Sequence, residues 1–334
     1  QLSPTMSLLQ TFSLLHHASH QAFPIGRNGS VIKRAKFICR SWPARQFNLR
    51  WFQLLRDDGF LRRLAAHDHR IYRKLYRPYL SASWSKPQTL AALQANYALL
   101  QAILPSATLE KIFLTDEFCL AEWSANRTYR LHLTHDPRFY QEGELTLSLR
   151  CPDLGEGELA LLSATLAPTG DGSLAMFIGG LQGADRALGA PAIKDAGRDL
   201  HGLRPKSLIV IAAQLLARQL GCQHILATTA ASHAYSTDER RQSAERQKMF
   251  FDYDTFWQEC DGVPEGKAFL ALPLTSARRP REDMKPQKRP MYARRYAMLD
   301  EIAANLAHAI SKKECQRRPT PESSADHQFP NNEP

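Results

Sequence analysis

Residues 174–235 constrain the fold of this chain more than any other stretch. A short apolar run at 174–178 ends in a glycine-rich segment at 179–183. An apolar helix is expected to open at 201–207, and a second strand follows at 223–229. This order predicts a strand–helix–strand crossover. The glycine backbone and the positive charge near the start of the helix would suit an anionic ligand, above all a phosphate.

The glycine-rich segment allows two interpretations. Gly179, Gly180 and Gly183 could let backbone approach a ligand closely, with Lys206 binding its phosphate. They could equally mark a β-bulge or tight turn, with Lys206 an ordinary surface charge at a helix end.

The residues around the crossover indicate a mostly antiparallel sheet. Apolar and polar residues alternate at 145–150, and a second strand is expected at 159–166. A turn at 168–172 predicts a hairpin with 174–178. A short helix at 253–260, a last strand at 267–272 and a C-terminal helix follow. We expect an α+β domain over 126–312.

The remaining parts of the chain are predicted to differ from this domain. Residues 1–45 contain Pro24, Gly26, Gly29 and Pro43 and are expected to be irregular. Residues 46–125 are expected to be helical. An apolar stripe there reads as packing surface, and comprises Leu90, Leu93, Tyr97, Leu100 and Leu104. Residues 313–334 are polar and proline-rich and are expected to be disordered.

Charge is concentrated toward the two ends of the chain. The net charge is +10; residues 27–77 carry 14 Lys and Arg against three acids, and residues 278–318 carry 12 against five. Such stretches favour an acyl carrier protein or an anionic membrane surface, or they simply keep the surface hydrated. Nucleic acid is not expected, because no recognition motif accompanies the charge.

Several classes of protein are not expected from the sequence. No apolar run reaches 18 residues, and the first 20 residues lack the pattern of a signal peptide. The six cysteines form no CxxC pair or Cys/His cluster, so we expect reduced thiols, no metal site and a cytoplasmic location, with possible peripheral contact at the inner membrane.

The order of elements is similar to that of the GNAT acyltransferase fold. In that fold two neighbouring strands splay, and the gap admits the pantetheine arm of an acyl thioester. The resemblance implies no permanently bound cofactor, but acyl-CoA or the phosphopantetheine of acyl carrier protein as co-substrate. The residues assigned to it are Gln182, Gly183, His201, Gly202, Arg204 and Lys206. Residues 184–203 interrupt the usual acetyl-CoA loop, which favours relatives that take long acyl chains or a carrier protein.

Four residues are candidates for acid–base chemistry. Glu142 and Glu144 are two positions apart at the start of an expected strand and would share one face. Either could deprotonate an amine, or both could be exposed edge acids. His233 and Tyr235 follow the strand after the crossover, where they could act as base and acid or could be packed residues.

Seven motifs in order resemble the VirK/YbjX family of Gram-negative bacteria. They lie at 77–80, 142–145, 178–183, 193–208, 232–235, 253–257 and 288–296. The resemblance covers residues 45–305 and implies a bacterial protein linked to virulence and resistance to antimicrobial peptides. It implies no catalytic residues, since the domain of this family has no assigned function.

Taken together, these features favour a GNAT-like N-acyltransferase. Its acceptor would be an amine of a small molecule, peptide or lipid precursor. The alternative is a non-enzymatic envelope-associated protein that docks through its basic surfaces.

Overall fold

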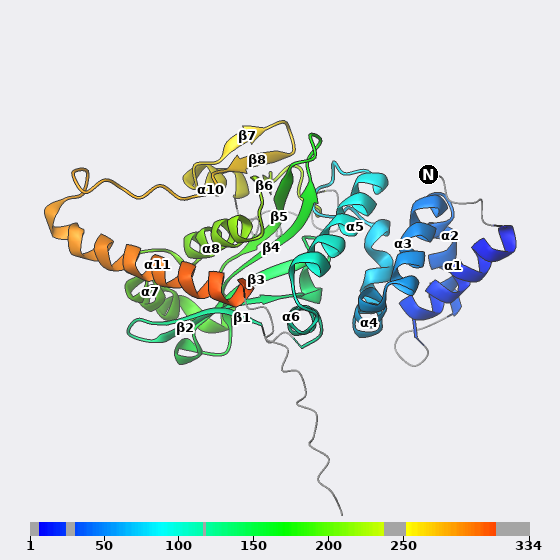
Figure 1. The fold of residues 1–334 in the computed structure, drawn as a ribbon, viewed down its shortest axis with the longest axis horizontal. Helices are drawn as coiled ribbons and strands as arrows, with labels where there is room; N and C mark the ends of the chain where they lie inside the picture. Colours follow the sequence, from blue (N-terminus) through cyan, green and yellow to red (C-terminus); the bar gives the residue numbers. More distant parts are fainter. Residues whose placement is uncertain (1–6, 25–30, 116–117, 237–251, 312–334) are drawn as a thin grey trace, which may run out of the picture.

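One eight-stranded sheet organises the fold (Figure 1). The computed structural model describes residues 7–24, 31–115, 118–236 and 252–311. The strands are β1 (Cys119–Ser124), β2 (Thr128–Thr134), β3 (Leu145–Arg150), β4 (Glu158–Pro168), β5 (Leu174–Gln182), β6 (His224–Thr228), β7 (Val263–Glu265) and β8 (Phe269–Leu272). The helices are α1 (Leu8–Ala22), α2 (Val31–Ser41), α3 (Arg45–Asp57), α4 (Gly59–His67), α5 (Lys86–Ile103), α6 (Ser106–Glu110), α7 (Gly189–Asp199), α8 (Pro205–Gln219), α10 (Tyr253–Glu259) and α11 (Arg289–Ser311). Shorter helical turns are η1 (His69–Tyr76), η2 (Lys111–Thr115), η3 (Pro137–Phe139), η4 (Pro152–Leu154), η5 (Arg186–Leu188) and η7 (Pro286–Lys288).

The sheet is mixed and mostly antiparallel, as the sequence predicts. Its strand order is β1-β2-β3-β4-β5-β6-β8-β7. Strands β1 to β5 pair antiparallel, β6 pairs antiparallel with β8, and β8 pairs antiparallel with β7. The pair β5–β6 is parallel, and helix α8 connects its two strands. An α+β fold with a helical crossover is therefore confirmed.

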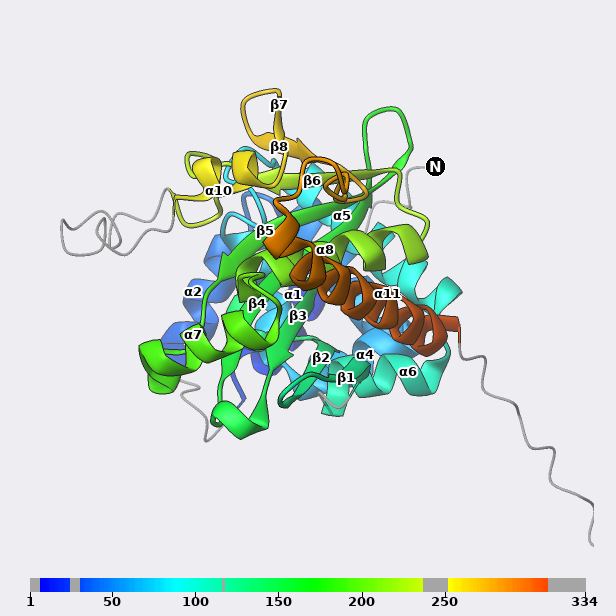
Figure 2. The same ribbon diagram turned by 90° about the vertical axis from the view of Figure 1, so that its left-hand side faces the viewer.

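Helices cover both faces of this sheet. Helices α8 and α11 lie on one face, and α5 with the N-terminal helices lies on the other (Figure 2). The apolar stripe predicted on α5 is buried against the sheet: Leu93 is fully buried, and Tyr97 and Leu100 are each 1% exposed. Ser85 caps this helix through a reciprocal pair of hydrogen bonds with Gln88, which fixes where α5 begins.

The prediction of an irregular segment over residues 1–45 is wrong. Helices α1 and α2 occupy most of it, and α3 begins at Arg45. Ser7 and Gln10 form a capping box at the start of α1. Pro24 follows the end of α1 rather than interrupting it, so the breakers separate two helices instead of preventing them. The predicted tail at 313–334 lies outside the described residues.

Candidate functional site

The parallel pairing of β5 and β6 stops near the middle of the sheet, where β6 itself ends at Thr228. Their parallel pairing ends at Ile178 and Ala227, whereas β5 continues to Gln182. The hydroxyl of Tyr253 binds the buried backbone of Leu181 on the side without a partner strand: it accepts from the N–H (3.3 Å) and donates to the C=O (3.2 Å). A side chain from α10 therefore occupies the backbone groups that a further strand would use.

The glycines of β5 form a β-bulge. Opposite β4, Gly180 pairs with Ser163 and Ile178 pairs with Ala164, so Gly179 is the extra residue. A methyl group at Gly179 would lie 2.0 Å from the carbonyl oxygen of Glu142, and one at Gly180 would lie 1.9 Å from its Oε2. The structure therefore has the predicted bulge at Gly179, and the lack of side chains at Gly179 and Gly180 lets Glu142 pack against the sheet.

This packing predicts a large difference between two glycine substitutions. Gly179→Ala should lower the free energy of unfolding by about 1–3 kcal/mol, because the backbone of Glu142 cannot yield easily. Gly170→Ala is the matched control, since no atom lies within 4 Å of the added methyl group. Urea unfolding of both variants measures the difference. Equal stability of the two would show that the segment of Glu142 is free to move away.

Glu142 and His233 face each other in the space beside this bulge. Glu142 Oε1 lies 3.9 Å from His233 Nε2, and the two residues are 5% and 3% exposed. The backbone N–H of Tyr235 donates to His233 Nδ1 (3.3 Å). In a neutral imidazole the proton is then on Nε2, so His233 directs an N–H toward the carboxylate.

Two tyrosines enclose this carboxylate–imidazole pair. The ring of Tyr253 stacks on His233 at a centroid distance of 5.2 Å, and the ring of Tyr235 lies at 5.4 Å. The structure thus brings together three of the predicted acid–base residues through their contacts with His233, and it adds Tyr253. Sequence reasoning missed Tyr253 as a site residue, although it begins one of the seven motifs.

Part of the predicted phosphate-binding set also comes together. A methyl group at Gly183 would lie 2.8 Å from Cε of Lys206, so the end of β5 lies beside the first turn of α8. Burial, with the neighbouring charge of Arg204, lowers the pKa of Lys206. Gln182 is exposed at the end of β5. These three residues place a cation and exposed backbone at the mouth of the crossover.

The other members of that predicted set have different contacts. Arg204 forms an ion pair with Glu259 on α10. The carbonyl of His201 accepts two hydrogen bonds from the guanidinium of Arg295 on α11, at 2.7 and 3.1 Å. Gly202 adopts a left-handed conformation (φ 76°) that continues this turn. His201 and Gly202 therefore fix the turn between α7 and α8 against α11.

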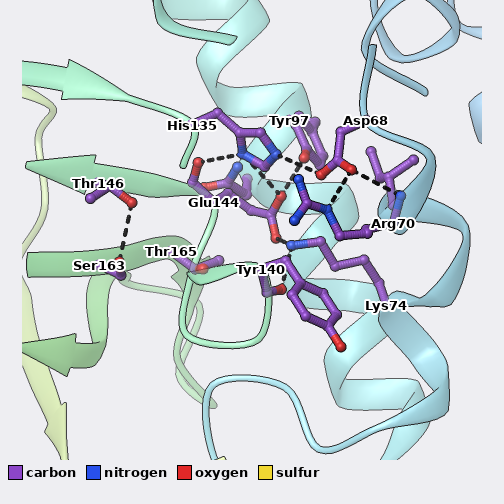
Figure 3. A network of polar contacts seen from close by, with 12 residues as sticks. Asp68, Arg70, Lys74, Tyr97, His135, Tyr140, Glu144, Thr146, Ser163 and Thr165 are labelled. Atoms are coloured by element: carbon purple, nitrogen blue, oxygen red, sulfur yellow. Dashed lines mark hydrogen bonds and ion pairs between the residues drawn. The ribbon is translucent and has the colours of Figure 1, made fainter. Parts of the chain in front are cut away.

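Glu144 is not the exposed acid at a strand edge that one interpretation of the sequence predicts. It is fully buried, and its Oε1 accepts from Lys74 Nζ (2.5 Å) and from the hydroxyl of Tyr79 (2.7 Å). Tyr97 donates to its other oxygen (Figure 3). Burial, followed by the adjacent carboxylate, raises the pKa of both tyrosines, so the phenols remain donors. Glu144 is therefore enclosed by structural partners.

A second carboxylate extends this network toward the N-terminal helices (Figure 3). His135 Nδ1 donates to the carbonyl of Glu144 (2.9 Å), and its Nε2 lies 3.8 Å from Asp68 Oδ2. Arg70 binds the other oxygen of Asp68 at 2.9 Å. Burial opposes ionisation of Asp68, but the nearby His135 and the hydrogen bonds and charge of Arg70 outweigh it and hold the pKa of Asp68 below its usual value. The network joins η1, α5 and the sheet.

Few features of the sequence indicate this network. Lys74 lies in the most basic stretch of the chain, where composition predicts a hydrated surface. Tyr97 was part of an apolar stripe, and its hydroxyl carries no signal in a periodicity argument. Tyr79 lies in the first of the seven motifs, which was the available hint.

The described residues contain neither a membrane-spanning helix nor a cluster of metal ligands. Among 7–24, 31–115, 118–236 and 252–311, no helix has both the length and the apolar composition needed to cross a bilayer. Within the same ranges, no three His, Cys, Asp or Glu residues form a group able to hold a metal ion.

Comparison with known proteins places these residues in a family. Residues 27–308 match the family model described as a protein of unknown function (DUF535). The chain is 33% identical to the uncharacterized protein YbjX of Escherichia coli K12 over 277 residues, which cover 82% of each chain. It is 23% identical to an uncharacterized protein of Haemophilus influenzae over 290 residues, covering 86% of this chain and 94% of that one. The chain therefore belongs to the VirK/YbjX family of bacterial proteins, which shares the DUF535 domain.

Proposed function

We propose that this protein is a GNAT-like N-acyltransferase that moves an acyl group from a thioester carrier to an amine. The observation that carries the proposal is the Glu142–His233 pair near the end of β6, where β5 continues without a partner strand on that side. The strand order supports a GNAT-like layout, because a single parallel pair connected by a helix follows four antiparallel strands. In crossover folds, ligands bind at such a strand end.

The carrier would bind along the end of β5. Its amide groups would pair with the backbone of Leu181 after the hydroxyl of Tyr253 moves away. Its phosphate would meet Lys206 and the N–H groups at Gly183 and the start of α8. Residues 184–203 fold into an added turn and α7 between β5 and α8. The carrier in this proposal is either CoA or the phosphopantetheine of acyl carrier protein.

Glu142 is the general base in this proposal. His233 Nδ1 already accepts from the backbone, so its Nε2–H faces the carboxylate at 3.9 Å and could hydrogen-bond it after a small shift. The amine nitrogen attacks the thioester carbonyl, Glu142 takes the amine proton, and the C–S bond breaks. Tyr235 donates a proton to the departing thiolate and is reprotonated from Glu142 through solvent. This assigns positioning to His233 and acid–base roles to Glu142 and Tyr235.

Binding of the carrier is tested directly by native mass spectrometry. The protein is incubated with acyl-CoA and, separately, with acyl carrier protein carrying acyl chains of several lengths. We expect a bound pantetheine species with at least one carrier. Lys206→Glu should weaken it about tenfold or more, because the phosphate loses its cation. Arg186→Glu, on the exposed turn η5, is the charge-matched control. Binding of neither carrier would contradict the proposal.

A non-enzymatic role is the second candidate. It is favoured by a separate basic pocket among the N-terminal helices. In that role the protein would act in the cytoplasm, at the inner face of an anionic membrane, without transferring a group. The two candidates differ in their dependence on Glu142, whose charge only the transferase requires.

A further inference from the structure

A basic pocket lies between α2, η1 and the segment that precedes β3. It has a volume of about 220 Å³. Five of its lining residues are cations from two separate stretches of chain: Lys33, Lys36, Arg40, Arg73 and Arg77. None of the nine described residues that line it is acidic. Such convergence of like charge favours the binding of an anion in this space.

Four of the five pocket cations form no ion pair among the described residues: Lys36, Arg40, Arg73 and Arg77. Arg73 Nε is buried and has no hydrogen-bond partner within the described part of the chain. Burial lowers the pKa of Arg73; the nearby Tyr140 and Asp68 oppose this shift, while the charges of Arg70 and Arg77 add to it. A desolvated guanidinium fork with an unused N–H is suited to an oxyanion.

Aromatic side chains form the rest of the wall. The guanidinium of Arg73 lies 5.7 Å from the centroid of the Phe23 ring. Phe37 and Tyr76 pack edge to face at 4.9 Å, and the hydroxyl of Tyr76 is bound to Ser41. Tyr140 completes the wall. These packed rings offer apolar surface to the group that carries the anion.

Two residues that line the pocket are linked to the buried network around Glu144. The carbonyl of Tyr140 accepts from Lys74 Nζ at 2.6 Å, and the same Lys74 holds Glu144 (Figure 3). Arg73 precedes Lys74 in η1. Arg73 is therefore held by buried structure, which lowers the entropic cost of ordering it around a ligand.

We propose that this pocket binds a phosphomonoester group. Several cations with two or more guanidinium forks match a compact dianion better than a single carboxylate. The volume accommodates one phosphate with a short attached group, and the aromatic wall suits an apolar or ring-shaped attachment. The same chemistry occurs in a soluble phosphate ester and in the headgroup of phosphatidic acid. This assignment stands independently of acyl transfer.

Two binding measurements test the pocket and separate these sources. Isothermal titration calorimetry uses glycerol 3-phosphate, with neutral glycerol as the negative ligand. Cosedimentation uses phosphatidylcholine vesicles with and without phosphatidic acid. Binding of glycerol 3-phosphate identifies a soluble ester as sufficient, and binding to phosphatidic acid vesicles alone identifies the lipid headgroup. Failure of the wild-type protein to bind either probe overturns the proposal.

Charge-reversal variants show whether binding occurs in the pocket. Lys36→Glu with Arg40→Glu should weaken binding about tenfold or more, because two cations become anions at the ligand. Arg50→Glu with Arg62→Glu is the matched control: both residues are exposed, lie outside the pocket and change the net charge equally. Thermal unfolding verifies that both variants are folded. Equal weakening by the two pairs would show attraction to overall charge and contradict a specific site.

Discussion

Glu142→Gln is expected to lower kcat for acyl transfer by about 10²–10⁴-fold, the usual contribution of a general base. Glutamine keeps the shape that packs against Gly180, so the fold should be retained. It removes the carboxylate that faces His233 and would accept the amine proton. The measurement is steady-state acyl transfer from the carrier identified by mass spectrometry, with thermal unfolding of the same preparation.

Two further variants show whether the loss belongs to this carboxylate. Glu122→Gln, an exposed residue of β1 paired with Arg130, should retain the wild-type rate. His233→Ala should reduce kcat and also shift the pH profile, because the carboxylate loses the imidazole N–H that faces it at 3.9 Å. Full activity of Glu142→Gln would remove Glu142 from the mechanism.

Lys74→Met is expected to lower the free energy of unfolding by about 3–5 kcal/mol. The substitution leaves the Glu144 carboxylate fully buried without its cation, since both side chains of this pair are 0% exposed. The hydroxyls of Tyr79 and Tyr97 would remain as donors but carry no charge. Equilibrium unfolding in urea measures the effect.

The double variant Lys74→Met with Glu144→Gln separates lost charge from lost packing. Removing both charges should recover part of the stability, because no uncompensated ion remains buried. Arg56→Met, which breaks the exposed pair with Asp57, is the control and should cost about 1 kcal/mol or less. A Lys74→Met protein as stable as this control would mean that Glu144 is not held as an ion by Lys74.

The architecture could be predicted from the sequence because its signals are periodic. Alternation at 145–150, the turn at 168–172 and the glycine-rich end of β5 each have a local cause, and all three correspond to elements of the sheet. Helices α1 and α2 were not predicted because the prolines and glycines of this segment indicate irregular structure. The capping box at Ser7 is a sequence signal for the start of α1. A proline or glycine ends a helix only at its own position, so such residues can separate two helices without preventing either.

The site could be predicted only in part, because side chains far apart in sequence complete it. Glu142, His233 and Tyr235 could be named from their strand-end positions, and the structure brings them together. Glu144 directly precedes β3 and was named for the same reason, but its buried partners Lys74 and Tyr97 lie in helical segments far away in the sequence. One-dimensional patterns do not reveal such pairing.

One short segment connects the two sites described above. Tyr140 lines the basic pocket, Glu142 faces His233, and Glu144 closes the buried network. Gln141 between them binds the carbonyl of Pro78 at 3.0 Å, which fixes the segment to the chain that follows η1. The N-terminal helices therefore support the residues beside the sheet as well as the pocket.

Hydrogen–deuterium exchange on addition of the acyl carrier tests most directly where the thioester binds. The account predicts new protection of the amides of residues 181–183 and of the first turn of α8, with little change in α2 and η1. Protection confined to α2 and η1, or unchanged exchange at the end of β5 with the carrier bound, would contradict the assignment of this strand end as the carrier site.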